Sequence, residues 1–141
     1  MASKKEQILA AMITALQGTD GVGNRIYRSR VEPLARNESP ALIVEPVSIS
    51  NQQNTSLPTL DSTLRVRAAI IIRALIPDQA SDDTMVSLHS KLMADLTLGG
   101  LAIDIRPAEV TFTFAEADQP AGVISCEYDV LYRTQVADIS Q

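Results

Sequence analysis

The residues of this chain that could act in catalysis are its single cysteine, Cys126, and its single histidine, His89. A cysteine attacks as a thiolate and needs a base beside it, so the fold would have to bring these two side chains together. Cys126 stands on the apolar side of an alternating stretch, which is typical of a small buried hydrophobe. We therefore interpret Cys126 as a core residue and keep a cysteine-dependent enzyme as the weaker alternative.

The spacing around His89 does not favour a metal site. A helical metal site needs a second ligand one turn away, and neither Asp82 nor Asp95 has that spacing. The glycine-rich run of residues 18–24 follows no strand and ends in no lysine–serine pair, so it does not predict a nucleotide site. We expect no metal and no cofactor.

Two carboxylates, Glu127 and Asp129, have the spacing of neighbours on one face of a strand. In a pocket such a pair can do acid–base chemistry, but without one it is typical of a solvated or salt-bridged face. The polar side of another stretch, residues 63–75, carries Arg65, Arg67 and Arg73. If the two stretches are neighbouring strands, the arginine row meets the acid row. We expect an ion-paired face and no catalytic residue.

The faces opposite these charges are apolar in both stretches. Because side chains alternate across a strand, each stretch is expected to bury one face. The residues on these two faces are Leu64, Val66, Ala68, Ile70, Ile72, Ile124, Cys126, Tyr128, Val130 and Tyr132.

Two amphipathic helices are predicted beside these strands. Ser3 and Glu6 have the spacing of a capping box, and apolar residues then recur at helical spacing as far as Leu16. A second helix begins after Ser81, which is a good N-cap residue, and two glycines end it. Its buried stripe is predicted to be Met85, Leu88, Leu92 and Leu96.

Shorter strands are predicted at residues 25–29, 41–49, 101–105 and 109–114. Pro46 indicates an edge position, a bulge or an early end of pairing, because proline cannot donate to the ladder. Residues 50–62 predict a long, mobile polar loop, and residues 135–141 a short polar tail. These elements predict an α+β fold in which two helices pack on one face of a mostly antiparallel sheet of four to five strands.

The composition indicates one globular domain, residues 1–141. Hydrophobic residues make up 45% of the chain, which is enough for a core without a disulfide or a metal. The net charge of −5 argues against nucleic-acid binding, because phosphates need a basic face. The sequence shows neither a signal peptide nor an apolar run long enough for a membrane, so synthesis in the cytoplasm is expected.

Several segments resemble the tail terminator, or tail completion, proteins of tailed phages, the family of minor tail protein U. The resemblance begins with a helix like residues 4–16 and a glycine-rich turn, and it ends with a polar loop, a strand, a helix and a closing strand. The segments that carry it are Ile26-Tyr27-Arg28-Ser29-Arg30, Pro33-Leu34, Ser39-Pro40-Ala41-Leu42-Ile43-Val44, Leu64-Arg65-Val66 and Ile124-Ser125-Cys126-Glu127-Tyr128-Asp129-Val130. It covers nearly the whole chain and rests on pattern and order.

The resemblance implies a structural role in the virion, at the junction of tail and neck. Proteins of this family form a ring, usually a hexamer, on the last disc of the tail tube. The ring stops polymerisation of the major tail tube protein and offers a surface to the head completion or connector protein. DNA would pass through the lumen without specific binding.

We expect subunits to meet through the polar sheet face and partners to bind the polar loop. The predicted interface residues are Arg65, Arg67, Arg73, Glu127, Asp129, Asn51, Gln52, Asn54 and Leu57. Three alternatives stay open: another neck or head–tail joining protein, a generic adaptor, and a small enzyme. The enzyme would use Cys126 with His89, or the carboxylates of Glu127 and Asp129.

Overall fold

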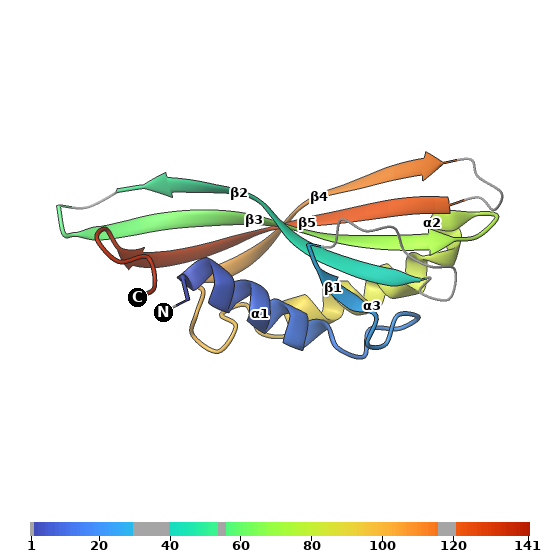
Figure 1. The fold of residues 1–141 in the computed structure, drawn as a ribbon, viewed down its shortest axis with the longest axis horizontal. Coiled ribbons are helices and arrows are strands. Elements are labelled where there is room, and N and C mark those ends of the chain that lie inside the picture. The colour runs from blue at the N-terminus through green and yellow to red at the C-terminus, as the bar shows by residue number, and fades with distance from the viewer. Residues whose placement is uncertain (1, 30–39, 54–55, 116–120) are drawn as a thin grey trace.

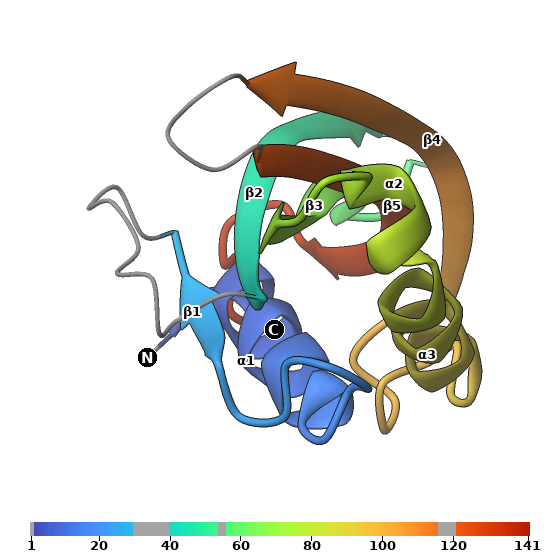
Figure 2. The ribbon, with the colours of Figure 1, turned by 90° about the vertical axis from the view of Figure 1, so that its right-hand side faces the viewer.

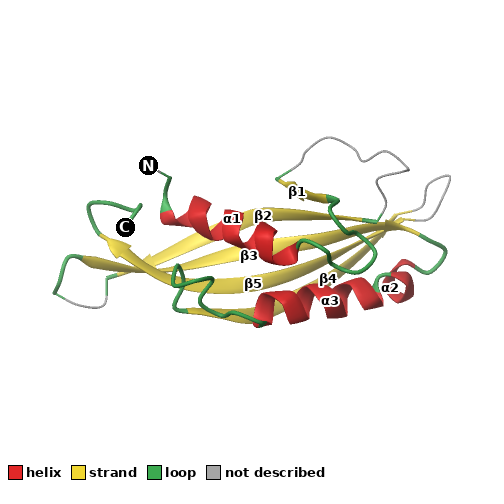
Figure 3. Ribbon diagram, turned by 90° about the horizontal axis from the view of Figure 1, so that it is seen from below, coloured by secondary structure: helices red, strands yellow, loops and turns green. Residues whose placement is uncertain are grey.

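A computed structural model of the chain describes residues 2–29, 40–53, 56–115 and 121–141. Within these ranges five strands form one twisted sheet, and three helices lie on one of its faces (Figures 1 and 3). The helices are α1 (Lys4–Leu16), α2 (Pro77–Ala80) and α3 (Asp82–Met93). The strands are β1 (Ile26–Arg28), β2 (Ala41–Gln52), β3 (Thr59–Arg73), β4 (Asp104–Ala115) and β5 (Ala121–Gln135).

The strand order β1-β2-β3-β5-β4 places β1 and β4 at opposite edges of the sheet (Figure 2). β1 runs parallel to β2, and the other three pairs are antiparallel. β3 and β5 pair along their whole length, from Thr59 opposite Gln135 to Arg73 opposite Ala121. These are the two alternating stretches of the sequence, so the predicted meeting of the arginine row with the acid row is confirmed.

The core lies between the sheet and the helices. The ten apolar residues predicted to face inward on β3 and β5 are all buried. The helix residues that pack with them in this core are Ile8, Leu9, Met12 and Leu16 of α1 and Leu88 and Leu92 of α3. Burial of apolar surface, at about 25 cal/mol per Å², is the main term that holds the helices on the sheet.

The predicted starts of α1 and α3 are both confirmed, but only α1 has a side-chain N-cap. The Ser3 hydroxyl accepts a hydrogen bond from the Glu6 amide at 3.3 Å, as an N-cap residue does. Ser81 has a helical backbone, because the single turn of α2 leads directly into α3, and its hydroxyl donates to the Asp78 carbonyl. Leu96 is 40% exposed rather than buried, because α3 ends at Met93.

The predicted fold class was wrong. The sheet is mixed, because β1 and β2 are parallel, and α2 adds a third helix. Strands take 48% and helices 24% of the described residues, so the molecule is mostly β and is not two helices on a sheet. The two strands predicted around Pro107 are a single strand, β4, whose register shifts between Pro107 and Glu109. Proline cannot donate to the ladder, but the bulge places Pro107 at an irregular point of the pairing. The strand therefore continues where the sequence suggested a break.

The predicted loop at residues 50–62 was also mostly wrong. β2 continues to Gln52 and β3 begins at Thr59, so most of this segment is a long hairpin. Of the three possibilities left open at Pro46, the register shift between Pro46 and Ser48 shows the bulge. The predicted tail begins one residue later, because β5 includes Gln135. Its backbone contacts α1, where the Lys4 amide donates to the Ile139 carbonyl at 2.8 Å.

Candidate functional site

The sheet face opposite the helices carries a ladder of ion pairs. Arg65 Nε donates to Asp129 Oδ1 at 2.9 Å, and Arg65 Nη2 donates to Asp129 Oδ2 at 3.2 Å. Arg67 Nη1 donates to Glu45 Oε1 at 3.1 Å, and Arg67 Nη2 lies 3.9 Å from Glu127 Oε1. The hydrogen bonds with Asp129 raise the pKa of the Arg65 guanidinium above its usual value.

The ladder continues toward the tip of the β2–β3 hairpin. Arg133 Nε donates to Asp61 Oδ1 at 2.6 Å, again between β5 and β3. All of these pairs join neighbouring strands of one chain, so each charge already has a partner. A subunit contact through the same side chains would have to compete with these partners. Arg73 lies on the same face at the end of β3, level with Ala121, and it is half-buried.

The residues predicted to bind a partner do not form one surface. Asn51 and Gln52 follow each other in β2, so they project to opposite faces of the sheet. Asn51 Oδ1 accepts a hydrogen bond from the Ser62 hydroxyl at 2.7 Å, whereas Gln52 is level with Asp61 on the ion-paired face. Leu57 is 64% exposed beyond the end of β2. Asn54 lies outside the described residues.

The structure brings Cys126 and His89 to one apolar groove between α3 and β4. The groove has a volume of about 320 Å³, and Met85, Val86 and Ser90 of α3, Val110 of β4 and Tyr128 of β5 complete its lining. His89 Nδ1 lies 2.9 Å from the Tyr128 hydroxyl. Burial raises the pKa of the Cys126 thiol to about 11, so the sulfur is protonated at neutral pH. A protonated, buried thiol is a poor nucleophile.

An exposed apolar row on β4 was not predicted from the sequence. Val110, Phe112 and Phe114 lie level with Cys126, Ile124 and Gly122 of β5, so they face the helix side of the sheet. Their exposed fractions are 45%, 49% and 57%. The sequence contains two phenylalanines, and both stand in this row. Two phenylalanines at alternate positions of one strand were the available signal for this row. The same pattern is equally typical of a strand face buried in the core.

β4 is also an edge strand with an open backbone. Among the described residues it pairs with β5 alone, so its outer N–H and C=O groups meet no other strand. Natural edges are usually blocked by charges, prolines or bulges. β4 carries these features at Arg106, Pro107 and Glu109, but residues 110–115 read Val-Thr-Phe-Thr-Phe-Ala. This half has high β propensity, no charge and no proline.

A second open edge lies on the other side of the sheet. β1 covers β2 only at residues 42–44. Val47 stands in the bulge after Pro46 and has no partner on β3, and residues 48–52 of β2 pair with β3 and with no other strand in the described part of the chain. Val47 and Ile49 are each 42% exposed there, and the segment carries no charge. The chain therefore presents two different uncharged strand edges.

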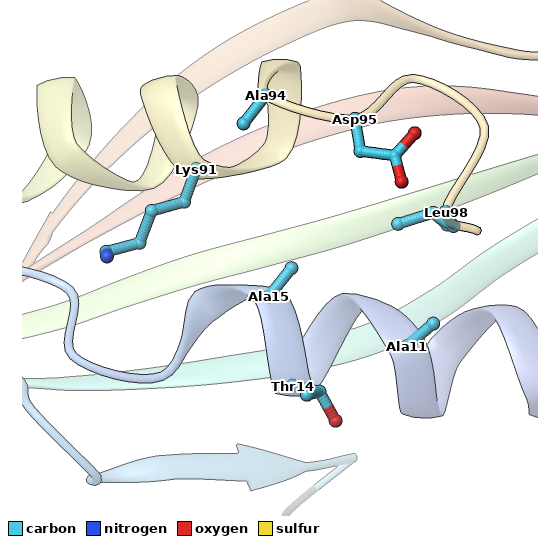
Figure 4. A pocket seen from close by; sticks show the side chains of 7 residues that line it. All are labelled: Ala11, Thr14, Ala15, Lys91, Ala94, Asp95 and Leu98. Carbon is cyan, nitrogen blue, oxygen red and sulfur yellow. The ribbon is translucent and has the colours of Figure 1, made fainter.

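A further hollow, of about 390 Å³, lies between α1 and α3 (Figure 4). Alanines 11, 15 and 94 and Thr14 form much of its surface, and Lys91, Asp95 and Leu98 complete the lining. Asp95 is engaged locally, because its carboxylate accepts hydrogen bonds from Thr97 and from the Gly99 amide. These bonds lower the pKa of Asp95. The hollow brings together no set of polar groups that would suggest a reaction.

No model of a known protein family matches the sequence, and no curated protein matches it either. In the described ranges no helix is both long enough and apolar enough to cross a membrane. In the same ranges no group of three or more histidine, cysteine or acidic side chains is placed to hold a metal ion. The features that remain as candidates for function are the two strand edges, the apolar row on β4 and the ion-paired face.

Proposed function

We propose that this chain is a structural protein of tailed-phage assembly, a tail terminator. Copies of it would form a ring on the end of the tail tube, at the tail–neck junction of the virion, after assembly in the host bacterial cytoplasm. The ring would stop polymerisation of the major tail tube protein and offer the head completion or connector protein a surface. The proposal takes its function from the family resemblance of the sequence.

The single observation that best supports an assembly role is the exposed apolar edge of β4. Burying Phe112 and Phe114 against another chain would remove a large aromatic surface from water, and aromatic residues are enriched where interfaces bind most strongly. An uncharged edge of this kind also favours aggregation when nothing covers it. In an assembly, a neighbouring chain would cover this edge.

The second open edge, on β2, supports a ring in particular. A contact between two different surfaces of the same chain is heterologous, and it leaves one free surface of each kind on every copy. Such a contact closes into a ring when the rotation between neighbours is an integral fraction of a turn. Six copies is the number that the resemblance implies.

The ion-paired face would suit a surface that DNA passes without binding to it. Its charges are already neutralised within the chain, so the face offers few unpaired cations to phosphates. The net charge of −5 acts in the same direction. We propose that DNA passes this protein without specific binding.

Electron microscopy of tails assembled without this chain tests the proposal. We expect tubes of irregular, excessive length that carry no heads, and normal tails after the protein is supplied again. Tubes of regulated length with heads attached, in the absence of the chain, would rule the role out. Tubes of normal length that lack heads would favour another neck protein, the nearest alternative.

A cysteine-dependent enzyme is the second candidate, because Cys126 and His89 do line one groove. The raised thiol pKa argues against it. Replacing Cys126 by serine and His89 by glutamine would abolish the activity of such an enzyme. Normal tail assembly with both variants would end this alternative.

A further inference from the structure

We propose that the open edge of β4 in one copy pairs, as an antiparallel strand, with the open edge of β2 in the next copy. The inference rests on the proposed function and specifies which surfaces join neighbouring copies. The segments that meet are residues 110–115 of β4 and residues 48–52 of β2. The two sheets would then continue into each other through main-chain hydrogen bonds.

Strand direction is the first support for this pairing. β2 is antiparallel to β3, β3 to β5 and β5 to β4, so β2 and β4 run in opposite directions at the two sides of the sheet. When a second copy continues the sheet in the same orientation, its β2 lies antiparallel to β4 of the first copy. Antiparallel ladders are slightly more stable per residue than parallel ones.

The alternation of side chains is the second support. On β4 the phenylalanines face the helix side, and Thr111 and Thr113 face the ion-paired side, level with Ser125 and Val123. On β2, Ile49 lies level with buried Leu64, and Ser48 and Ser50 lie level with Arg65 and Thr63 of the ion-paired face. When both copies keep their helices on the same side, the apolar row therefore meets Ile49. The threonines then meet the serines.

The absence of charge on both segments is the third support. Natural sheets place lysines or other charges on edges that must stay unpaired. Neither residues 110–115 nor residues 47–52 contain a charged residue, whereas the neighbouring parts of β4 carry Arg106 and Glu109. The regular open segments are therefore of similar length, six residues on β4 and five, residues 48–52, on β2.

The pairing requires neighbouring copies to be staggered along the strands. Val110 is level with Cys126 of β5, Ala68 of β3 and Val44 of β2, whereas the open part of β2 starts beyond Pro46. Closed arrangements of tilted strands have such a stagger as part of their geometry. The amount of stagger sets the register, which the experiment below determines.

Disulfide cross-linking between engineered cysteines tests the inference. In a Cys126→Ala background, Thr111→Cys or Thr113→Cys is combined with Ser48→Cys or Ser50→Cys in the same chain. The two positions lie at opposite edges of the sheet, so a disulfide joins different copies. After oxidation, with and without tail tubes, we expect at least one of the four double variants to shift from a monomer band to a ladder of multimers.

The single variants serve as controls and as a test of the competing arrangement. Thr111→Cys alone and Thr113→Cys alone are expected to stay monomeric. Dimers of a single variant would show that two β4 edges pair with each other by a twofold axis, which contradicts the inference. Ala10→Cys, on the exposed side of α1, replaces the β2 cysteine in a matched control and is expected to give no ladder.

Failure of the inference and failure of the proposed function give different results. Rings seen by electron microscopy, with no ladder from any double variant, would refute the β4–β2 contact and leave the tail terminator role in place. Two results together would refute both the proposed function and the contact. They are a monomeric chain in the presence of tail tubes, and tails of normal length with heads attached when the chain is absent.

Discussion

Glu6 serves two interactions, although its position in the sequence suggested only one. Its amide donates to Ser3, as the capping box predicts. Its carboxylate accepts hydrogen bonds from Arg28 Nη1 and Nη2 at 2.9 and 2.8 Å, and its Oε1 lies 2.7 Å from Lys5 Nζ. The side chain therefore ties the start of α1 to β1. The sequence could predict the cap from local spacing, but the arginine comes from a distant strand.

We expect this ion pair to make stability depend on pH in an acidic window. Hydrogen bonds from Arg28, then from Lys5, lower the pKa of Glu6 from 4.5 to about 2. Because the folded state binds this proton more weakly than the unfolded chain, the interaction stabilises the fold above pH 4.5 and is lost as the pH falls toward 2. Urea unfolding of the wild type and of Glu6→Gln is expected to differ at pH 7, with the difference closing near pH 2.

A double variant provides the control for this prediction. In an Arg28→Gln background, the Glu6→Gln change is expected to have a smaller effect at pH 7, because the main partner is gone. A difference between wild type and Glu6→Gln of the same size at both pH values would contradict the role of the ion pair.

Gly122 is the residue whose substitution the packing opposes most clearly. It is buried at the start of β5, and a Cβ atom there would lie 2.5 Å from Pro77 Cβ and 3.4 Å from Phe114 Cδ1. We expect Gly122→Ala to lower the free energy of unfolding by about 1–3 kcal/mol, because α2 or β4 must move. Ser125→Ala, on the open face of the same strand, is the matched control, with an expected change within about 0.5 kcal/mol.

Denaturant unfolding of both variants measures this difference. An unchanged free energy of unfolding for Gly122→Ala would show that α2 yields without cost, and the contact between α2 and β5 would then be looser than described.

At the scale of elements, the sequence predicted faces better than it predicted lengths and edges. The inward residues of β3 and β5 follow from alternation alone, because both sides of each strand differ sharply in polarity. The hairpin of β2 and β3 was missed because residues 50–62 are mostly of types that are not enriched in strands. Their strand structure depends on cross-strand pairs such as Asn51 with Ser62, which no local pattern shows.

The exposed apolar row on β4 could not be predicted for a different reason. Whether Phe112 and Phe114 are buried depends on the place of β4 in the strand order, and the sequence does not encode that order locally. The same alternating pattern is buried in β5, where strands and helices surround it, and exposed in β4.

A lysine on the edge of β4 is expected to block assembly without unfolding the chain. Thr111→Lys places a charge on the open edge, on the side away from the phenylalanines, where natural sheets put charges to prevent pairing. We expect loss of ring formation by mass photometry, with a thermal unfolding midpoint close to that of the wild type.

Ser125→Lys is the matched control, because Ser125 lies opposite Thr111 on the same face, one strand further in. It is expected to retain ring formation. If Ser125→Lys abolished the ring and Thr111→Lys did not, subunits would meet through the ion-paired face and not through the edge.

At the scale of the whole molecule, the arrangement suits a subunit whose uncovered surfaces are buried by neighbouring copies. The helices and one side of the sheet enclose the core, while among the described residues the edge of β4, the end of β2 beyond Pro46 and the ion-paired face stay uncovered. The charges of that face are paired within the chain, so they add little attraction between copies. Affinity between copies is then expected to come mainly from the apolar edge, with charge deciding which surfaces stay apart.

The mass of the purified chain on the ends of isolated tail tubes tests the self-assembly claim most directly. Mass photometry of the complex after release from the tubes, supported by end-on electron micrographs, gives the number of copies. We expect a closed ring with a mass near six times 15.2 kDa for the wild type, and single chains for Thr111→Lys. A single copy of the wild-type chain bound at the tube end would contradict self-assembly through strand edges.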